Sequence, residues 1–292
     1  MKFFIAATVL LLLTGFIFRS DISTFISGIP QQETKKKAGK KGADVMSEVS
    51  VKQKWELPAV LIEVSGIAYL DAQRFACVQD EAGTIYIYNV STAKIEKEIP
   101  FASPGDFEGI SLKGNTAYIV RSDGVIFEVD MLSKKTTEYN TFLTAADNVE
   151  TLFYQAAGNR LLVAGKEPDK QAPEMKNIYA FDLTNKSLQK TPIAQINLND
   201  RAFSATGKST KKKKGFMPSG IAVNPVDNDL YILDGPRSRL LVATLAGDVK
   251  KVYELGNEFY KPEGISFSPA GDLYISNEGK KIPGNILQVT LN

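Results

Sequence analysis

A short sequence phrase of five residues, for example segment 262–266 (PEGIS), recurs five times at nearly constant spacing. This repeat constrains the fold of the chain more than any other feature. Its third position falls at Gly66, Gly109, Thr151, Gly220 and Gly264, with intervals of 43, 42, 69 and 44 residues. A run rich in β-branched and aromatic residues follows each phrase, as in segment 272–276 (DLYIS), and a third, alternating run comes next, as in segment 84–88 (TIYIY). Repeats of roughly 40–50 residues that each hold about four short strands are typical of a β-propeller.

The runs themselves indicate strands, because they are short, alternate in polarity or are wholly apolar, and are bounded by Gly, Asn, Asp and Pro. We therefore predict an all-β fold, a five-bladed β-propeller. The predicted blade cores lie near 63–100, 106–143, 148–198, 217–255 and 261–292. The last blade lacks an outermost strand, and residues 49–57 (VSVKQKWEL) belong to no blade. We predict that this N-terminal strand completes the last blade, because a closed ring leaves no exposed sheet edge.

The long interval contains a basic insertion, predicted as a loop over residues 199–216 of the 51–292 propeller domain. Its lysines are Lys208 and the run 211–214. The segment lacks the first glycine of a P-loop and follows no strand. Lysines without interleaved aromatic residues also argue against a nucleic-acid partner. We interpret the insertion as a solvated loop; contact with anionic lipid or polysaccharide is the alternative.

The first 29 residues are expected to lie outside the propeller. An uncharged run from Phe3 to Phe18 separates Lys2 from Arg19, which predicts an N-terminal hydrophobic helix serving as a signal or signal-anchor. It is slightly shorter than the ~18–20 residues that span a bilayer comfortably. Because no A-x-A cleavage site is clear, we favour a single uncleaved membrane anchor at residues 3–18. The propeller would then be extracytoplasmic, in the periplasm or at the cell surface. Cleavage would make the protein secreted, and a buried core helix is a third interpretation.

Residues 30–50 are predicted to form a Lys-rich tether. This segment holds Lys35, Lys36, Lys37, Lys40 and Lys41 and few apolar residues. We interpret this segment either as a soluble linker or as a segment that contacts anionic lipid. Positive charge directly after an apolar run also opposes translocation, so it argues against easy export.

The chain has no histidine and one cysteine, which excludes whole classes of chemistry. Ser/His/Asp triads, Cys/His pairs, His-ligated metals, disulfides within the chain and Cys-rich metal sites are all ruled out. Carboxylates, lysine, tyrosine or an oxygen-ligated cation must carry any reaction. Cys77, in an apolar run, is expected to be a buried thiol, and Trp55 is expected to pack in the closing strand.

The residue before each repeated third position is expected to face the central channel of the propeller, where the innermost strands begin. These residues are Ser65, Glu108, Glu150, Ser219 and Glu263. Three carboxylates around one narrow axis repel one another unless a cation or shared protons intervene. The loops after the second strands open on the same face and bring further acids. The predicted metal ligands are Glu108, Glu150, Glu263, Asp80, Glu167, Asp234 and Glu278.

Calcium is the cofactor that this set predicts, because it takes six to eight hard oxygen ligands, whereas magnesium is less suited to an all-protein cage. The alternative for each single acid is that it bonds backbone amides between blades. The first hypothesis makes the protein a membrane-anchored binding module for a divalent cation, with a protein or cell-surface polymer as a further partner.

The order of the phrases resembles the SdiA-regulated protein family. The best matching segments are 261–265 (KPEGI), 273–278 (LYISNE) and 164–168 (AGKEP), and the resemblance covers roughly residues 53–292. It implies an N-terminal membrane segment, a five-bladed propeller related to NHL-repeat propellers and a calcium site, which we place at Glu108, Glu150 and Glu263. Two departures from the family pattern weaken the expected contribution of Asp123 to the calcium site. Thr151 replaces the usual glycine of the third phrase, and in Arg121-Ser122-Asp123 the carboxylate stands one position later than the pattern predicts.

The same phrases are similar to gluconolactonase-like and to esterase-like or phytase-like propellers, in which a divalent ion in the channel polarises a lactone or a phosphate. This resemblance keeps a metal-dependent hydrolase open as the alternative function. Lys166, which would stabilise an oxyanion or phosphate, and Glu263 are then the catalytic candidates.

The net charge of +2 conceals unlike parts. Residues 1–29 carry +1, residues 30–54 carry +4 and residues 199–216 carry +5, which leaves −8 on the rest of the chain. An acidic ring with basic appendages favours a cation site and a nearby anionic surface.

Overall fold

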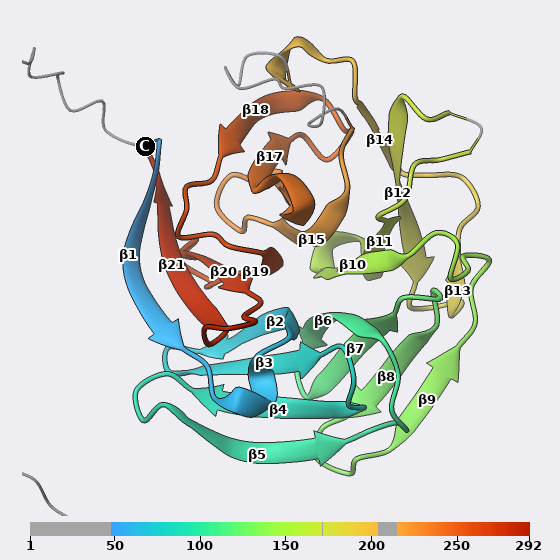
Figure 1. The fold of residues 1–292 in the computed structure, drawn as a ribbon. Coiled ribbons are helices and arrows are strands. Elements are labelled where there is room, and N and C mark those ends of the chain that lie inside the picture. The colour runs from blue at the N-terminus through green and yellow to red at the C-terminus, as the bar shows by residue number, and fades with distance from the viewer. Residues whose placement is uncertain (1–47, 171, 204–214) are drawn as a thin grey trace, which may run out of the picture. The chain divides into compact units, whose positions relative to one another are not determined.

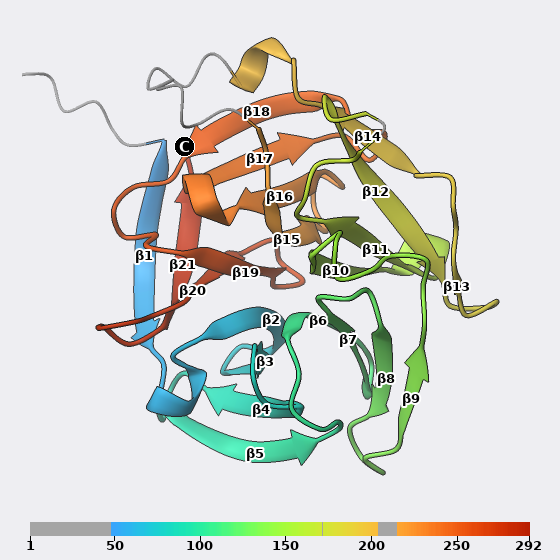
Figure 2. The same cartoon turned by 45° about the vertical axis from the view of Figure 1, so that its right-hand side comes forward.

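The computed structural model describes residues 48–170, 172–203 and 215–292, which form five antiparallel sheets arranged in a ring (Figures 1 and 2). The predicted all-β, five-bladed propeller is confirmed. The described residues contain no α-helix, only four short 3₁₀ turns: η1 (Ala59–Leu61), η2 (Ala156–Gly158), η3 (Arg201–Phe203) and η5 (Gly235–Arg237). The predicted N-terminal helix at residues 3–18, and most of the tether, lie outside the described residues. Within the described part of the chain, no helix is long and apolar enough to cross a membrane.

Four blades begin with their innermost strand and run outward along the chain. Blade 1 contains β2 (Val64–Asp71), β3 (Arg74–Gln79), β4 (Thr84–Asn89) and β5 (Lys94–Pro100). Blade 2 contains β6 (Phe107–Lys113), β7 (Thr116–Arg121), β8 (Ile126–Asp130) and β9 (Thr136–Tyr139). Blade 3 contains β10 (Val149–Gln155), β11 (Arg160–Gly165) and β12 (Met175–Asp182), with β13 (Ser187–Leu188) and β14 (Ala194–Asn197) both paired to β12. Blade 4 contains β15 (Pro218–Val223), β16 (Leu230–Asp234), β17 (Arg239–Ala243) and β18 (Val249–Glu254).

Blade 5 joins the two ends of the described chain. It contains β19 (Pro262–Phe267), β20 (Leu273–Asn277) and β21 (Asn285–Leu291), and its outermost strand is β1 (Val49–Glu56). The β1–β21 pair is antiparallel and runs from Val49 opposite Leu291 to Glu56 opposite Asn285. The predicted closing strand is therefore confirmed.

The hydrophobic core is divided among the interfaces between neighbouring blades. Each of five buried clusters draws its side chains from two adjacent sheets; Phe101, Phe107 and Phe127, for example, pack edge to face between blades 1 and 2. At the blade 5–blade 1 junction, Leu57, Leu61 and Tyr274 belong to one such cluster. The cavity at the axis of the ring is lined by serine, glutamate and glycine residues of the innermost strands and by five aliphatic side chains, Ile67, Ile110, Leu152, Ile221 and Ile265.

Candidate functional site

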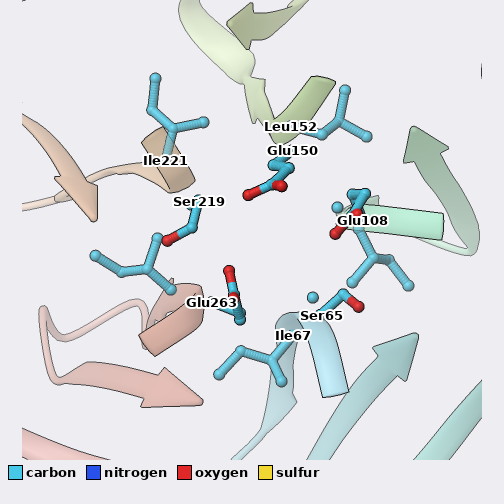
Figure 3. A pocket seen from close by; sticks show the side chains of 14 residues that line it. Ser65, Ile67, Glu108, Glu150, Leu152, Ser219, Ile221 and Glu263 are labelled. Carbon is cyan, nitrogen blue, oxygen red and sulfur yellow. The ribbon is translucent and has the colours of Figure 1, made fainter. Parts of the chain in front are cut away.

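A β-bulge in each innermost strand explains the repeated phrase. Ser65 is skipped in the pairing of β2 with β3, because Val64 lies opposite Gln79 and Gly66 lies opposite Val78. The register breaks at the same point in every blade. The bulged residues are Ser65, Glu108, Glu150, Ser219 and Glu263, the last together with Gly264. A bulge re-aims the side chain of its extra residue, and here all five line one central cavity (Figure 3).

The third residue of the repeated phrase must be small where neighbouring innermost strands approach. A Cβ on Gly220 would lie 2.5 Å from the carbonyl oxygen of Glu263, and one on Gly264 would lie 2.8 Å from the backbone nitrogen of Ile67. Thr151 is the exception, and its hydroxyl is used locally: it accepts from the backbone N–H of Ala164 at 2.7 Å and donates to the carbonyl oxygen of the same residue at 3.1 Å. The Gly-Ile phrase thus combines a bulge with a close backbone approach.

The cavity has a volume of about 10 Å³, which suits one water molecule or one small ion. Organic ligands need pockets of about 300–1,000 Å³. The central cavity is therefore too small for an organic molecule.

The ring of bulged residues contains three carboxylates, and two lysines form ion pairs with them. The Lys166 ammonium, on the loop after β11, lies 2.5 Å from Oε1 of Glu150, whose side chain is 5% exposed. The Lys261 ammonium, just before β19, lies 3.3 Å from Oε1 of Glu263 and also contacts Glu278. Asn148 donates its side-chain amide to the same Glu150 oxygen at 3.1 Å. Lysine charge therefore offsets part of the repulsion that the sequence predicts for this ring.

Proton binding offsets the remainder. Burial, followed by repulsion from Glu150, Asp106 and Glu263, raises the pKa of Glu108 to about 9. Burial and the Glu150 charge raise the pKa of Glu263 to about 7, although Lys261 and Lys166 act in the opposite direction. Burial raises the pKa of Glu150 as well, against the lowering effect of Lys166. Around neutral pH the free ring therefore retains protons on part of its carboxyls.

One oxygen of the ring is left without a partner. Oε2 of Glu150 is buried and accepts no hydrogen bond, in a residue only 4% exposed. Glu150 points toward the centre of the ring (Figure 3). A buried carboxylate oxygen that lacks a donor carries a desolvation cost, and it is the kind of ligand that a hard cation uses.

A second acidic group surrounds Asp80, at the end of blade 1 that faces the channel mouth. Burial, then Glu63 and Glu278, and to a lesser extent Asp106, raise the pKa of Asp80 to about 6. Oδ1 of Asp80 is buried without a hydrogen-bond partner. Of the predicted ligands, Asp80 and Glu278 thus share one electrostatic environment.

The other predicted ligands are placed differently. Asp234 is fully buried, and its carboxylate accepts from Arg239 at 2.5 Å and from Arg237 at 3.2 Å, which makes it an anchor for the start of β17. Glu167 is exposed on the loop after β11. Asp123 pairs with Arg121 in a two-pronged contact of 2.8 and 3.0 Å.

In the described ranges, no group of three or more Asp, Glu, Cys or His side chains is placed so that it could hold a metal ion. Carboxylate oxygens, including the unpartnered Oε2 of Glu150, are nevertheless the kind of ligand that a hard cation uses. Because Lys166 already contacts Oε1 of Glu150, such an ion would compete with the lysine charge for this carboxylate.

Three residues near the ring were missed at the sequence level. Lys261 directly precedes the Pro-Glu-Gly phrase and Asn148 precedes Glu150 by two positions, so adjacency alone could have indicated them. Lys176 is buried in β12, with 3% exposed, and no sequence pattern links it to the loop it supports.

Comparison with known proteins supports the fold. No protein-family model matches the chain, and no curated protein matches it. The structure resembles Myxococcus xanthus glutaminyl cyclase, with a TM-score of 0.60, 14% identity, and coverage of 84% of this chain and 96% of that one. It also resembles a protein of unknown function from Bacteroides thetaiotaomicron (TM-score 0.50, 15% identity, 77% and 58% coverage). Virginiamycin B lyase from Staphylococcus aureus aligns at a TM-score of 0.46 and 14% identity, over 82% and 74% of the two chains. At such identities the likeness to the first two structures supports the fold alone and transfers no activity, and the SdiA-regulated family stays a prediction.

Proposed function

We propose that this propeller binds a divalent cation, calcium in preference to magnesium, at the mouth of its central channel. Glu108, Glu150 and Glu263 would hold the ion. The single observation that carries the proposal is the unpartnered, buried Oε2 of Glu150, which is one of the three bulged carboxylates that line the cavity. The ion would supply positive charge where burial and mutual repulsion now force the carboxyls to retain protons.

The role of the channel-mouth face follows from the size of the cavity. About 10 Å³ admits the ion but no organic molecule, so a further ligand would contact the mouth from outside. We therefore propose a binding or interaction module for a protein or cell-surface polymer, held extracytoplasmically by the segment at residues 3–18.

Calcium titration of the whole chain, followed by thermal melting, tests this function. At a calcium concentration of 100 Kd, binding to the folded state alone adds about 2.7 kcal/mol, or roughly 5–10 °C for a domain of this size. Glu150→Gln should lose this shift, whereas Glu98→Gln, an exposed acid on the outermost strand β5, should keep it. An equal shift in both variants would place the ion elsewhere.

A metal-dependent hydrolase of lactone or phosphoester type is the second candidate. The Lys166 ammonium and the Glu263 carboxyl, with a pKa of about 7, lie close enough to influence each other's protonation. Glu263 would then exchange a proton with the substrate near neutral pH, and Lys166 would stabilise developing negative charge. Calcium-dependent turnover of a lactone or phosphoester that disappears in Glu263→Gln would favour this function over the binding module.

A further inference from the structure

The start of the loop between β11 and β12, residues 165–167, is held to the protein from both sides. On one side, the backbone N–H of Lys166 donates to the carbonyl oxygen of Asn148 at 2.8 Å, and the N–H of Glu167 donates to Asp147 at 3.2 Å. A Cβ on Gly165 would lie 2.7 Å from the Asp147 carbonyl oxygen, so the two segments are in close backbone contact. The backbone that carries Lys166 is therefore held in one position.

On the other side, a second lysine, Lys176, donates hydrogen bonds to backbone carbonyl oxygens of the same loop. The ammonium of Lys176 donates to the carbonyl oxygens of three consecutive residues: Gly165 at 3.0 Å, Lys166 at 3.1 Å and Glu167 at 2.6 Å. Three neighbouring carbonyl dipoles aimed at one point need a positive charge there. Lys176 uses all three of its donors in this way, and it is only 3% exposed.

These contacts make Lys166 unlike an ordinary surface lysine. Most exposed lysine–carboxylate pairs add little, because ordering a long side chain costs entropy. The Lys166 side chain is 16% exposed, its partner Glu150 is 5% exposed, and the backbone is already fixed. Its ammonium thus lies against one oxygen of the carboxylate whose other oxygen has no partner.

We infer that Lys166 is a built-in competitor for the cation site, a specificity-determining residue that Lys176 positions. This inference rests on the proposed cation site and names the residue that sets its affinity. A divalent ion on Oε2 of Glu150 meets the repulsion of the ammonium that lies on Oε1, and an ion that takes both oxygens has to displace that ammonium. A monovalent ion offers the carboxylate no more charge than the lysine does. The pair therefore selects divalent over monovalent cations.

Removal of the competitor changes stability and affinity in opposite directions. Lys166→Met leaves the ring more negative, which should lower the melting temperature in chelator and tighten calcium binding at least tenfold. It should also let sodium at about 0.1 M compete with calcium more than it does in the wild type. A purely structural lysine would lower the melting temperature and leave calcium affinity unchanged or weaker.

Isothermal titration of the whole chain with calcium chloride, in wild type, Lys166→Met, Lys176→Met and the double variant, tests the inference. We expect Lys176→Met to tighten binding three- to tenfold, and the double variant to match Lys166→Met, because both act through one contact. Lys250→Met is the matched control: this lysine pairs with Asp229 at 2.6 Å in blade 4, outside the ring, and its loss should leave calcium affinity unchanged.

The outcomes separate the two claims. If neither the wild type nor any variant binds calcium, the proposed function is wrong. If the wild type binds but Lys166→Met binds equally or more weakly, only the inference is overturned. Should Lys176→Met fail to fold, Lys176→Gln keeps a donor for the loop carbonyls. Its affinity should lie between those of the wild type and Lys166→Met, and a value equal to the wild type removes Lys176 from the inference.

Discussion

Replacing Glu263 with glutamine should change how the stability of the metal-free propeller depends on pH. Glu263 is 5% exposed, and its pKa rises from 4.5 to about 7, first because of burial and then because of Glu150. A carboxyl with a raised pKa in the folded state holds a proton there that it loses more readily when unfolded. Its contribution to stability is complete below about pH 4.5 and is lost as the pH rises through 7.

The size of the effect follows from the difference between the two pKa values. At about 1.4 kcal/mol per pH unit, Glu263 accounts for a loss of about 3 kcal/mol between pH 4.5 and pH 8. Glutamine has a similar shape and no charge, so the variant should lose about that much less than the wild type over the same range. Comparing the pH-induced change within each protein cancels the lost contact with Lys261 to first order.

Urea unfolding at pH 4.5 and pH 8, in the presence of a chelator, measures this difference. The wild type should become less stable on going to pH 8, with Glu108 adding to the loss, because its pKa of about 9 has the same sign. Glu98→Gln should behave as the wild type does. A wild-type stability that is level or rises toward pH 8, or an equal loss in Glu263→Gln, would refute the electrostatic account of the ring.

Two further predictions concern the fold around the ring. Deleting residues 49–57 removes the outermost strand of blade 5 and exposes β21, so the melting temperature should fall sharply; an unchanged melt would show that β1 does not close the ring. Gly220→Ala places a Cβ 2.5 Å from the Glu263 carbonyl oxygen and should cost about 1–3 kcal/mol. Gly256→Ala meets no atom within 4 Å and should be close to neutral in the same urea experiment, so equal effects would contradict the close packing at the axis.

The sequence was most informative where the fold repeats. Five phrases at near-constant spacing predicted the blades, the closing strand and the ring positions, because each phrase marks the same bulge in the same strand. Glu108, Glu150 and Glu263 could be placed together for that reason alone, without knowledge of any loop.

Loop residues could not be placed in this way. Asp234 has the same position in its repeat as other acids at the channel end of the blades. Its carboxylate nevertheless forms ion pairs with Arg237 and Arg239, which lie three and five residues further along the chain. The contact between Lys166 and Glu150 depends on a loop held by Lys176, and the pairing of Lys261 with two acids depends on side-chain conformation. Such contacts arise from tertiary packing and leave no periodic signal.

Calcium binding by the whole chain near neutral pH is the measurement that tests the central claim most directly. Titration in two buffers of different ionisation enthalpy reports both the affinity and the protons released. We predict binding that stabilises the fold, releases protons from the Glu108 and Glu263 carboxyls, whose pKa values are about 9 and 7, and disappears in Glu150→Gln. No binding heat and no change in melting temperature at millimolar calcium would contradict the account.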